Sequence, residues 1–299
     1  MHAIQESNFG FPKSLTGLVN PFKDVQDSPH FRAKLEAREL PANRYVIFFT
    51  PRSGSSRLTD IVAAADGLGK PGECFNLKHI REMIEFFGAQ SMQDYVNLLM
   101  RYRNDAGTFG SEIAMGQMHT FFASPDAFFD IYQPTACLFL IRENIIQQAV
   151  SMSRKKQTGV AHNTPRSVTD ARSGEFKYDA GEIAKALKRL AKQEVLIEEL
   201  CSQRGIEPLR LSYESLLDKT ATQFLPVIAE FVGADLTNVE GARSDHQKLG
   251  DEKNLAFAKR FADERSRLVE SIEERRASTL ATLRLQNARH FPSASTLSE

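Results

Sequence analysis

The chain alternates short apolar runs with longer stretches in which apolar residues recur every three or four positions. The short runs are bounded by turn-forming residues and predict buried strands at residues 45–49, 108–113, 136–141 and 209–213. The longer stretches predict helices at 55–66, 125–132, 144–156, 180–203 and 222–232, a helix-rich region at 77–103, and one long or broken surface helix at 254–288. Apolar strands that alternate with helices predict an α/β fold with a central parallel sheet flanked by helices.

The same pattern divides the 299 residues into three parts. Residues 1–43 form a mixed, proline-containing N-terminal arm with hydrophobic anchors at 8–12 and 20–22. Residues 44–290 hold the predicted sheet and helices, and the polar residues 291–299 are expected to be a disordered tail. Three interpretations of the arm stay open, because it could cover the core, bind a partner or be loosely packed.

Composition narrows the classes of function. The 38 basic and 38 acidic residues balance, which argues against a nucleic-acid surface or a polybasic membrane patch. There is no run of 18 apolar residues and no secretory signal pattern, so we expect a cytoplasmic protein without integral membrane association. The three cysteines are odd in number and far apart, which fits a reducing compartment, and the seven scattered histidines form no metal motif. No metal is therefore expected.

The most informative motif follows the first strand, where residues 50–56 read TPRSGSS. A strand that ends in a small-residue turn and opens a helix is suited to bind an anion, because the first amides of a helix have no partner within it. Arg52 adds a positive charge to this loop. The alternative is an ordinary turn that caps a helix. The loop lacks the G-x-x-x-x-G-K-[ST] pattern and no Mg²⁺ carboxylate is evident, so a small kinase is disfavoured.

Further candidate groups lie where two other strands end. Arg142 follows the third strand, Ser151 lies nine residues later on the next helix, and the fourth strand ends at Tyr213. In an open parallel sheet, ligands bind beyond the carboxyl ends of the strands. Two anion sites at strand-to-helix junctions suit a nucleotide that carries phosphates at two positions of its sugar.

Taken in order, these motifs resemble those of the PAPS-dependent sulfotransferases, and most closely the bacterial branch typified by trehalose 2-sulfotransferase. The resemblance extends from about residue 45 to 264 and rests on four segments: 50–56 (TPRSGSS), 141–151 (IRENIIQQAVS), 211–216 (LSYESL) and 250–254 (GDEKN). Arg52 follows the bacterial form of the first segment. Glu252 departs from the family, which usually has tryptophan there, so base stacking at that position is in doubt.

The resemblance implies a P-loop-like sulfotransferase domain over residues 44–290. It also implies PAPS (3′-phosphoadenosine 5′-phosphosulfate) as the donor and adenosine 3′,5′-bisphosphate as the product. The 5′-phosphate would be held by the first segment, through Arg52, Ser53, Gly54, Ser55 and Ser56. Arg52 would also stabilise the negative charge that grows on the bridging oxygen during transfer.

The other segments would bind the rest of the nucleotide. Arg142 and Ser151 would hold the 3′-phosphate, Tyr213 would lie near the adenine, and the loop that contains Lys248 and Gly250 would add charge near the 3′-phosphate. Each residue also has a purely structural alternative. Arg142 could form a surface ion pair, Ser151 could be an ordinary mid-helix serine, Tyr213 could belong to the core, and Lys248 could be a solvated lysine.

A general base is expected in residues 69–76 (GKPGECFN), which are similar to the G-x-P-x-E-F-F stretch of the bacterial enzymes. The glutamate of that stretch is the base proposed for the family, so the resemblance assigns this role to Glu73. A carboxylate within hydrogen-bond reach accepts the proton of an attacking hydroxyl. Glu73 could instead be a solvated loop carboxylate. Glu112, at the end of the second strand, is the rival base, although we expect it to form an ion pair.

The sequence therefore predicts an enzyme that transfers a sulfuryl group from PAPS to a hydroxyl of a carbohydrate or glycolipid acceptor. Two alternatives stay open: a sulfotransferase with another kind of acceptor, and a catalytically degenerate protein that binds a nucleotide or a partner. Residues 1–43, 76–105 and 155–180 are expected to shape the acceptor pocket. The bacterial relatives suggest a homodimer.

Overall fold

The structure is a computed structural model that describes residues 20–159, 176–244 and 252–291. Lys248, Gly250, most of the expected tail and the first part of the N-terminal arm lie outside these ranges. Within them, no helix has both the length and the apolar character needed to cross a membrane.

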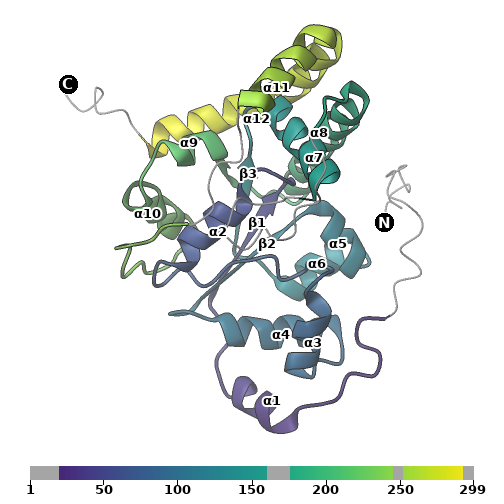
Figure 1. The fold of residues 1–299 in the computed structure, drawn as a ribbon. Coiled ribbons are helices and arrows are strands. Elements are labelled where there is room, and N and C mark those ends of the chain that lie inside the picture. Colours follow the sequence, from purple (N-terminus) through teal and green to yellow (C-terminus); the bar gives the residue numbers. More distant parts are fainter. Residues whose placement is uncertain (1–19, 160–175, 245–251, 292–299) are drawn as a thin grey trace, which may run out of the picture.

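A four-stranded sheet occupies the centre of the molecule (Figure 1). Its strands are β1 (Asn43–Phe49), β2 (Thr108–Ile113), β3 (Ala136–Ile141) and β4 (Leu209–Ser212). The order is β2-β1-β3-β4 and all three pairings are parallel. The predicted α/β architecture is thus confirmed, with strands within two residues of their expected limits.

Helices cover both faces of the sheet, because alternate residues of each strand are apolar on opposite sides. Tyr45, Ile47 and Phe49 pack against α2 (Ser55–Ala63) and α10 (Ala221–Val232). Val46 and Phe48 belong to a second cluster, built with α3 (Ile80–Phe87), α4 (Met92–Arg103), α5 (Met115–Phe121), α6 (Pro125–Tyr132) and one end of α8 (Ala180–Gln203). Figure 1 shows α2 and α10 on one side of the sheet and α5 and α6 on the other.

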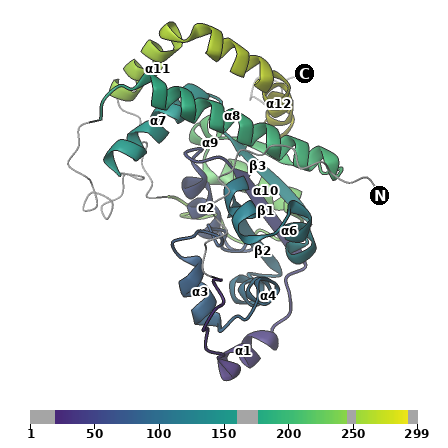
Figure 2. The same ribbon diagram turned by 90° about the vertical axis from the view of Figure 1, so that its right-hand side faces the viewer.

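A third apolar cluster joins the helices at one end of the molecule. It is formed by α7 (Ile145–Thr158), α8, α11 (Glu252–Glu264) and α12 (Ser266–His290). Figures 1 and 2 show α11 and α12 at this end, whereas α1 (Pro29–Glu36), α3 and α4 lie at the opposite end. The expected helix at 254–288 is therefore two helices that meet at Arg265. α12 buries Ile272, Arg276, Leu280 and Leu283, and its other residues are exposed or part-exposed, as expected of a surface helix with an intermittent apolar stripe.

Three helices were not expected from the sequence: α1, α5 and α9 (Tyr213–Leu217). Of the eight residues of α1 only Leu35 is buried, so the apolar period that would predict the helix is missing. It is tied to α4 by a two-hydrogen-bond ion pair from Arg32 to Asp94, at 2.6 and 2.8 Å. Tyr213 begins α9 rather than ending β4, since the Ser212 hydroxyl caps the helix by accepting from the Ser215 amide.

Candidate active site

The carboxyl ends of the parallel strands bring together most of the predicted site residues. The pairing of β1 with β2 and β3 places Ile47 between Glu112 and Leu138. The loop after β1, the start of α7 after β3, and α9 after β4 therefore all lie beyond the same edge of the sheet. This is the edge at which ligands bind in open parallel sheets.

Residues 50–54 form a tight, largely buried turn. The Ser53 amide donates to the Thr50 carbonyl at 3.1 Å, and both residues are fully buried. Arg52 (φ 69°) and Gly54 (φ 89°) have left-handed backbone conformations, which turn the chain into α2. A Cβ on Gly54 would lie 2.3 Å from the Tyr213 ring. Glycine is therefore required here by the backbone conformation and by the close approach of the aromatic ring.

The small side chains of the turn present polar groups at the start of α2. The Ser53 hydroxyl is buried and has no hydrogen-bond partner among the described residues. Ser55 and Ser56 are the first two residues of the helix, whose first amides have no partner within it. The Ser55 hydroxyl is hydrogen-bonded to Glu112. A buried orphan hydroxyl beside the positive end of a helix is typical of a site that accepts an anion.

The turn is joined directly to α7. The Arg52 Nε donates to the Ser151 hydroxyl at 3.1 Å, and an Arg142 Nη donates to the Arg52 carbonyl at 3.3 Å. Gln148 fixes the turn from the same helix, because its amide nitrogen donates to the Thr50 hydroxyl (2.8 Å) and to the Pro51 carbonyl (2.9 Å). The predicted 5′-phosphate and 3′-phosphate residues thus form one connected cluster.

This cluster concentrates positive charge. Burial, followed by repulsion from Arg142 and Arg154, lowers the pKa of Arg52 to about 10. Desolvation and then repulsion from Arg52 also lower the pKa of Lys155. A guanidinium with a pKa of about 10 stays charged at neutral pH, so the like charges around Arg52 favour an anion between them.

Arg154 and Lys155 were not among the predicted site residues. They lie three and four positions after Ser151 on α7, the spacing that puts side chains on one helix face. That spacing was a signal in the sequence that could have identified them.

Glu214 partly balances the charge of Arg142. Its carboxylate lies 3.7 Å from the Arg142 Nε and accepts from the amides of Glu143 (2.9 Å) and Asn144 (3.3 Å) at the start of α7. The Arg142 guanidinium also lies over the Tyr213 ring, 4.8 Å from its centre. Arg142 therefore has an ion-pair partner, as the alternative interpretation expected, but it is buried rather than at the surface, and it also contacts the turn after β1.

The two candidate bases lie in different environments. Glu73 is part-exposed, and its Oε2 accepts from the side-chain amides of Asn76 (2.6 Å) and Gln117 (3.0 Å). Glu112 is buried and its Oε2 has no partner among the described residues. Burial and then repulsion from Glu73 raise the pKa of Glu112 to about 8. The described residues provide no cation for Glu112, so the expected ion pair is wrong.

The late segment of the family resemblance is only partly described. Lys248 and Gly250 lie outside the described residues, whereas Glu252 is the first residue of α11. The structure therefore does not place these two predicted nucleotide contacts.

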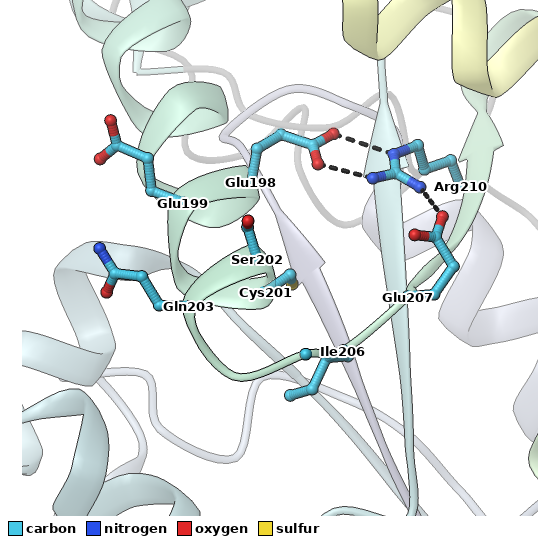
Figure 3. A pocket seen from close by; sticks show the side chains of 9 residues that line it. Glu198, Glu199, Cys201, Ser202, Gln203, Ile206, Glu207 and Arg210 are labelled. Atoms are coloured by element: carbon cyan, nitrogen blue, oxygen red, sulfur yellow. Dashed lines mark hydrogen bonds and ion pairs between the residues drawn. The ribbon is translucent and has the colours of Figure 1, made fainter.

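A large hollow lies elsewhere on the molecule, with a volume of about 720 Å³. It is formed by the end of α8 and the residues that lead into β4, at the amino end of that strand. Figure 3 shows Glu198 and Glu207 converging on Arg210, with hydrogen bonds of 2.6 to 2.9 Å. Because its arginine is paired with two carboxylates, this hollow lacks the excess of positive charge that surrounds the turn after β1.

Residues 123–264 match the family model of the Stf0 sulphotransferases. The matched segment contains Arg142, Ser151 and Tyr213, together with β3, α7, α8 and β4. No curated protein matches the chain. The resemblance to sulfotransferases is thus confirmed, and the match supports an enzyme that carries out sulfuryl transfer to a hydroxyl acceptor.

Proposed function

We propose that the protein transfers the sulfuryl group of PAPS to a hydroxyl of a carbohydrate or glycolipid acceptor, with Glu73 as general base. The observation that carries this proposal is the hydrogen bond from Arg52 to Ser151. It joins the turn after β1 to the helix after β3, the two places where the resemblance expects the 5′- and 3′-phosphates.

The residues present fit a nucleotide with two phosphates. The Ser53 hydroxyl, buried and without a partner among the described residues, supplies an orphan donor at the start of α2. The crowded charges of Arg52, Arg142 and Arg154 favour two anionic groups over one. Ser53 to Ser56 with Arg52 would hold the 5′-phosphate, and Arg142 with Ser151 would hold the 3′-phosphate.

Sulfuryl transfer forms a bond between the acceptor oxygen and sulfur and breaks the bond between sulfur and the oxygen of the 5′-phosphate. Adenosine 3′,5′-bisphosphate leaves with the electron pair of the broken bond. Arg52 stabilises the charge that grows on this oxygen, an effect of about 10²–10³ in rate for one preorganised donor. Ser151 and the turn of the backbone hold Arg52 in place.

The acceptor hydroxyl loses its proton to Glu73 as its oxygen attacks. Two amide donors orient the Glu73 carboxylate without neutralising it, which leaves its second oxygen to face the hydroxyl. A positioned general base contributes about 10²–10⁴ in rate. Glu112 is less suited to this role, because its raised pKa keeps it protonated at neutral pH.

Calorimetric titration with adenosine 3′,5′-bisphosphate tests the proposal. We expect micromolar binding that does not depend on Mg²⁺ and is lost in Arg142→Ala. Arg284→Ala, which removes an exposed arginine from α12, is the control and should bind as the wild type does. Absence of binding by the wild type would contradict the proposal. Binding without sulfuryl transfer to any offered sugar or glycolipid would support the degenerate nucleotide-binding protein instead.

A further inference from the structure

A second cavity, of about 530 Å³, is lined by none of the residues of the turn after β1. Its walls come from residues 20–24 of the N-terminal arm and from α3, α4 and α5. The apolar lining is formed by Phe22, Leu77, Ile80, Met92 and Phe121. Leu77 is 48 % exposed, so its side chain is accessible from the cavity. Mostly apolar cavities of this size are typical of small-molecule sites.

Two lining residues of the cavity lie close in the chain to the residues that hydrogen-bond to Glu73. Asn76 and Gln117 donate to the Glu73 Oε2. Leu77, which lines the cavity, follows Asn76 in the chain, and Phe121, which also lines it, lies four positions after Gln117 on α5. Residues four positions apart share a helix face, so the side of α5 that holds Glu73 also lines the cavity. A hydroxyl held at Glu73 therefore places the rest of its molecule near these apolar walls.

The outer wall of the cavity is held in place by hydrogen bonds. An Arg81 Nη donates to the carbonyls of Pro21 (2.8 Å) and Lys23 (2.7 Å), while its Nε pairs with Glu85 at 2.6 Å. Arg81 thus fixes residues 20–24 against α3. A cavity whose walls are already in place binds a ligand with little loss of protein conformational entropy.

We propose that this cavity binds an apolar group carried by the acceptor, so that the substrate class is an amphiphile: a sugar hydroxyl attached to an alkyl or acyl chain. The proposal rests on the sulfuryl-transfer function proposed above, because it takes Glu73 as the group that meets the hydroxyl. An alkyl chain in the cavity removes apolar surface from water, and each buried methylene group strengthens binding by roughly fourfold.

The test compares methyl and octyl β-D-glucopyranoside, the latter below its critical micelle concentration, as ligands in calorimetric or NMR titrations without donor. We expect the octyl compound to bind the wild type at least tenfold more tightly. Leu77→Asp places a charge in the cavity at an exposed position and should reduce this preference about tenfold. Leu285→Asp, which changes a leucine that is 73 % exposed on α12, is the matched control and should retain it.

Equal affinity of the wild type for the two glucosides, or an octyl preference that Leu77→Asp leaves unchanged, would overturn the proposal. A wild-type dimer that Leu77→Asp converts to a monomer in sedimentation would also overturn it, because a second copy of the chain would then cover the cavity. The nucleotide titration described above separates this proposal from the proposed function. If the protein prefers the octyl compound but does not bind the nucleotide, only the proposed sulfuryl transfer is refuted. If it binds the nucleotide but shows no octyl preference, only the proposal of an amphiphilic acceptor is refuted.

Discussion

At the scale of single residues, the site separates two neighbouring carboxyl groups by their surroundings. The Glu112 amide donates to the Gly72 carbonyl at 3.1 Å, which places the end of β2 next to the residue before Glu73. Glu73 receives two amide hydrogen bonds, whereas Glu112 is buried with an unpartnered oxygen. Paired carboxyl groups with different environments are a common way to assign different proton states within one site.

Replacing Glu73 by Gln should lower turnover by about 10²–10⁴ and leave nucleotide affinity unchanged, because the amide keeps the shape but cannot accept the hydroxyl proton. The measurement is radiolabelled sulfuryl transfer together with the nucleotide titration. Glu82→Gln, a change at an exposed glutamate of α3, controls for the general effect of a lost charge. Wild-type turnover in Glu73→Gln would refute this role and make Glu112 the next candidate.

Glu112 should make the protein less stable as pH rises. Its pKa is raised from 4.5 to about 8 in the folded chain. Between these values the unfolded chain has released the proton and the folded chain retains it, so the free energy of unfolding falls by about 1.4 kcal/mol for each pH unit. Glu112→Gln should remove most of this slope and stabilise the protein at pH 8. Urea denaturation at pH 5, 6.5 and 8 measures it, and an unchanged slope in the variant would contradict the assignment.

At the scale of elements, the turn between β1 and α2 depends on a glycine for two separable reasons. A Gly54→Ala variant must hold a left-handed backbone, a penalty of roughly 1–2 kcal/mol, and must also displace the Tyr213 ring. Gly205→Ala is a matched control, because Gly205 also has positive φ (63°) but no atom lies within 4 Å of the position that its Cβ would take.

We therefore expect Gly54→Ala to lose more unfolding free energy than Gly205→Ala and to bind the nucleotide at least tenfold more weakly. Gly205→Ala should bind it normally. Urea denaturation and nucleotide titration of both variants provide the measurement. If the two variants lose equal unfolding free energy and Gly54→Ala binds the nucleotide as the wild type does, the contact between Gly54 and Tyr213 does not shape the turn.

The elements with a clear apolar pattern were predictable from the sequence. β2, β3, α6 and α8 have the expected limits, because their apolar residues are either continuous or regularly spaced. The region at 77–103 is two helices, since Gly88 ends α3 in a left-handed conformation and the Ser91 hydroxyl caps α4. α1 has no such signal. It is held by the ion pair of Arg32 with Asp94, 62 positions away, and by packing of Phe31 on the rings of Phe86 and Phe87, which a local pattern does not reveal.

At the scale of the whole molecule, the C-terminal helix α12 contacts the backbone that carries the candidate site. Arg276 of α12 is 2 % exposed and pairs with the buried Glu194 of α8 at 2.6 Å. It also donates to the carbonyls of Arg142 (2.7 Å) and Glu143 (3.0 Å), where β3 leads into α7. α12 thus fixes the backbone that carries Arg142.

Arg276→Met should reduce the free energy of unfolding by about 3–5 kcal/mol, because it leaves Glu194 buried without its charge partner. Arg275→Met, a change at the exposed neighbouring residue, should have little effect. In the double variant Glu194→Leu with Arg276→Met, stability should largely recover while nucleotide affinity stays low, since the carbonyls of Arg142 and Glu143 still lack their donor. If both stability and nucleotide affinity recover in the double variant, as measured by denaturation and titration, Arg276 contributes to stability alone.

The polar residues of the candidate site could be predicted from the sequence, whereas the contacts that hold them in place could not. Arg52, Arg142 and Ser151 could be found because they follow predicted strands, and a parallel sheet brings such positions to one edge. Arg276 could not, because a buried arginine in a charged helix has the same local pattern as an exposed one. The cavity proposed for the apolar group of the acceptor is formed by residues 20–24 together with α3, α4 and α5, an arrangement that only the folded chain displays.

The crowded cations around Arg52 have a consequence for the behaviour of the protein in solution. Folding buries Arg52 and brings it close to Arg142 and Arg154, and these effects lower its pKa, so part of the folding free energy opposes the desolvation and mutual repulsion of these charges. An anion among them relieves that repulsion only in the folded chain. By thermodynamic linkage, a nucleotide at 100 times its dissociation constant adds about 2.7 kcal/mol to the free energy of unfolding. The melting temperature should therefore rise with nucleotide concentration.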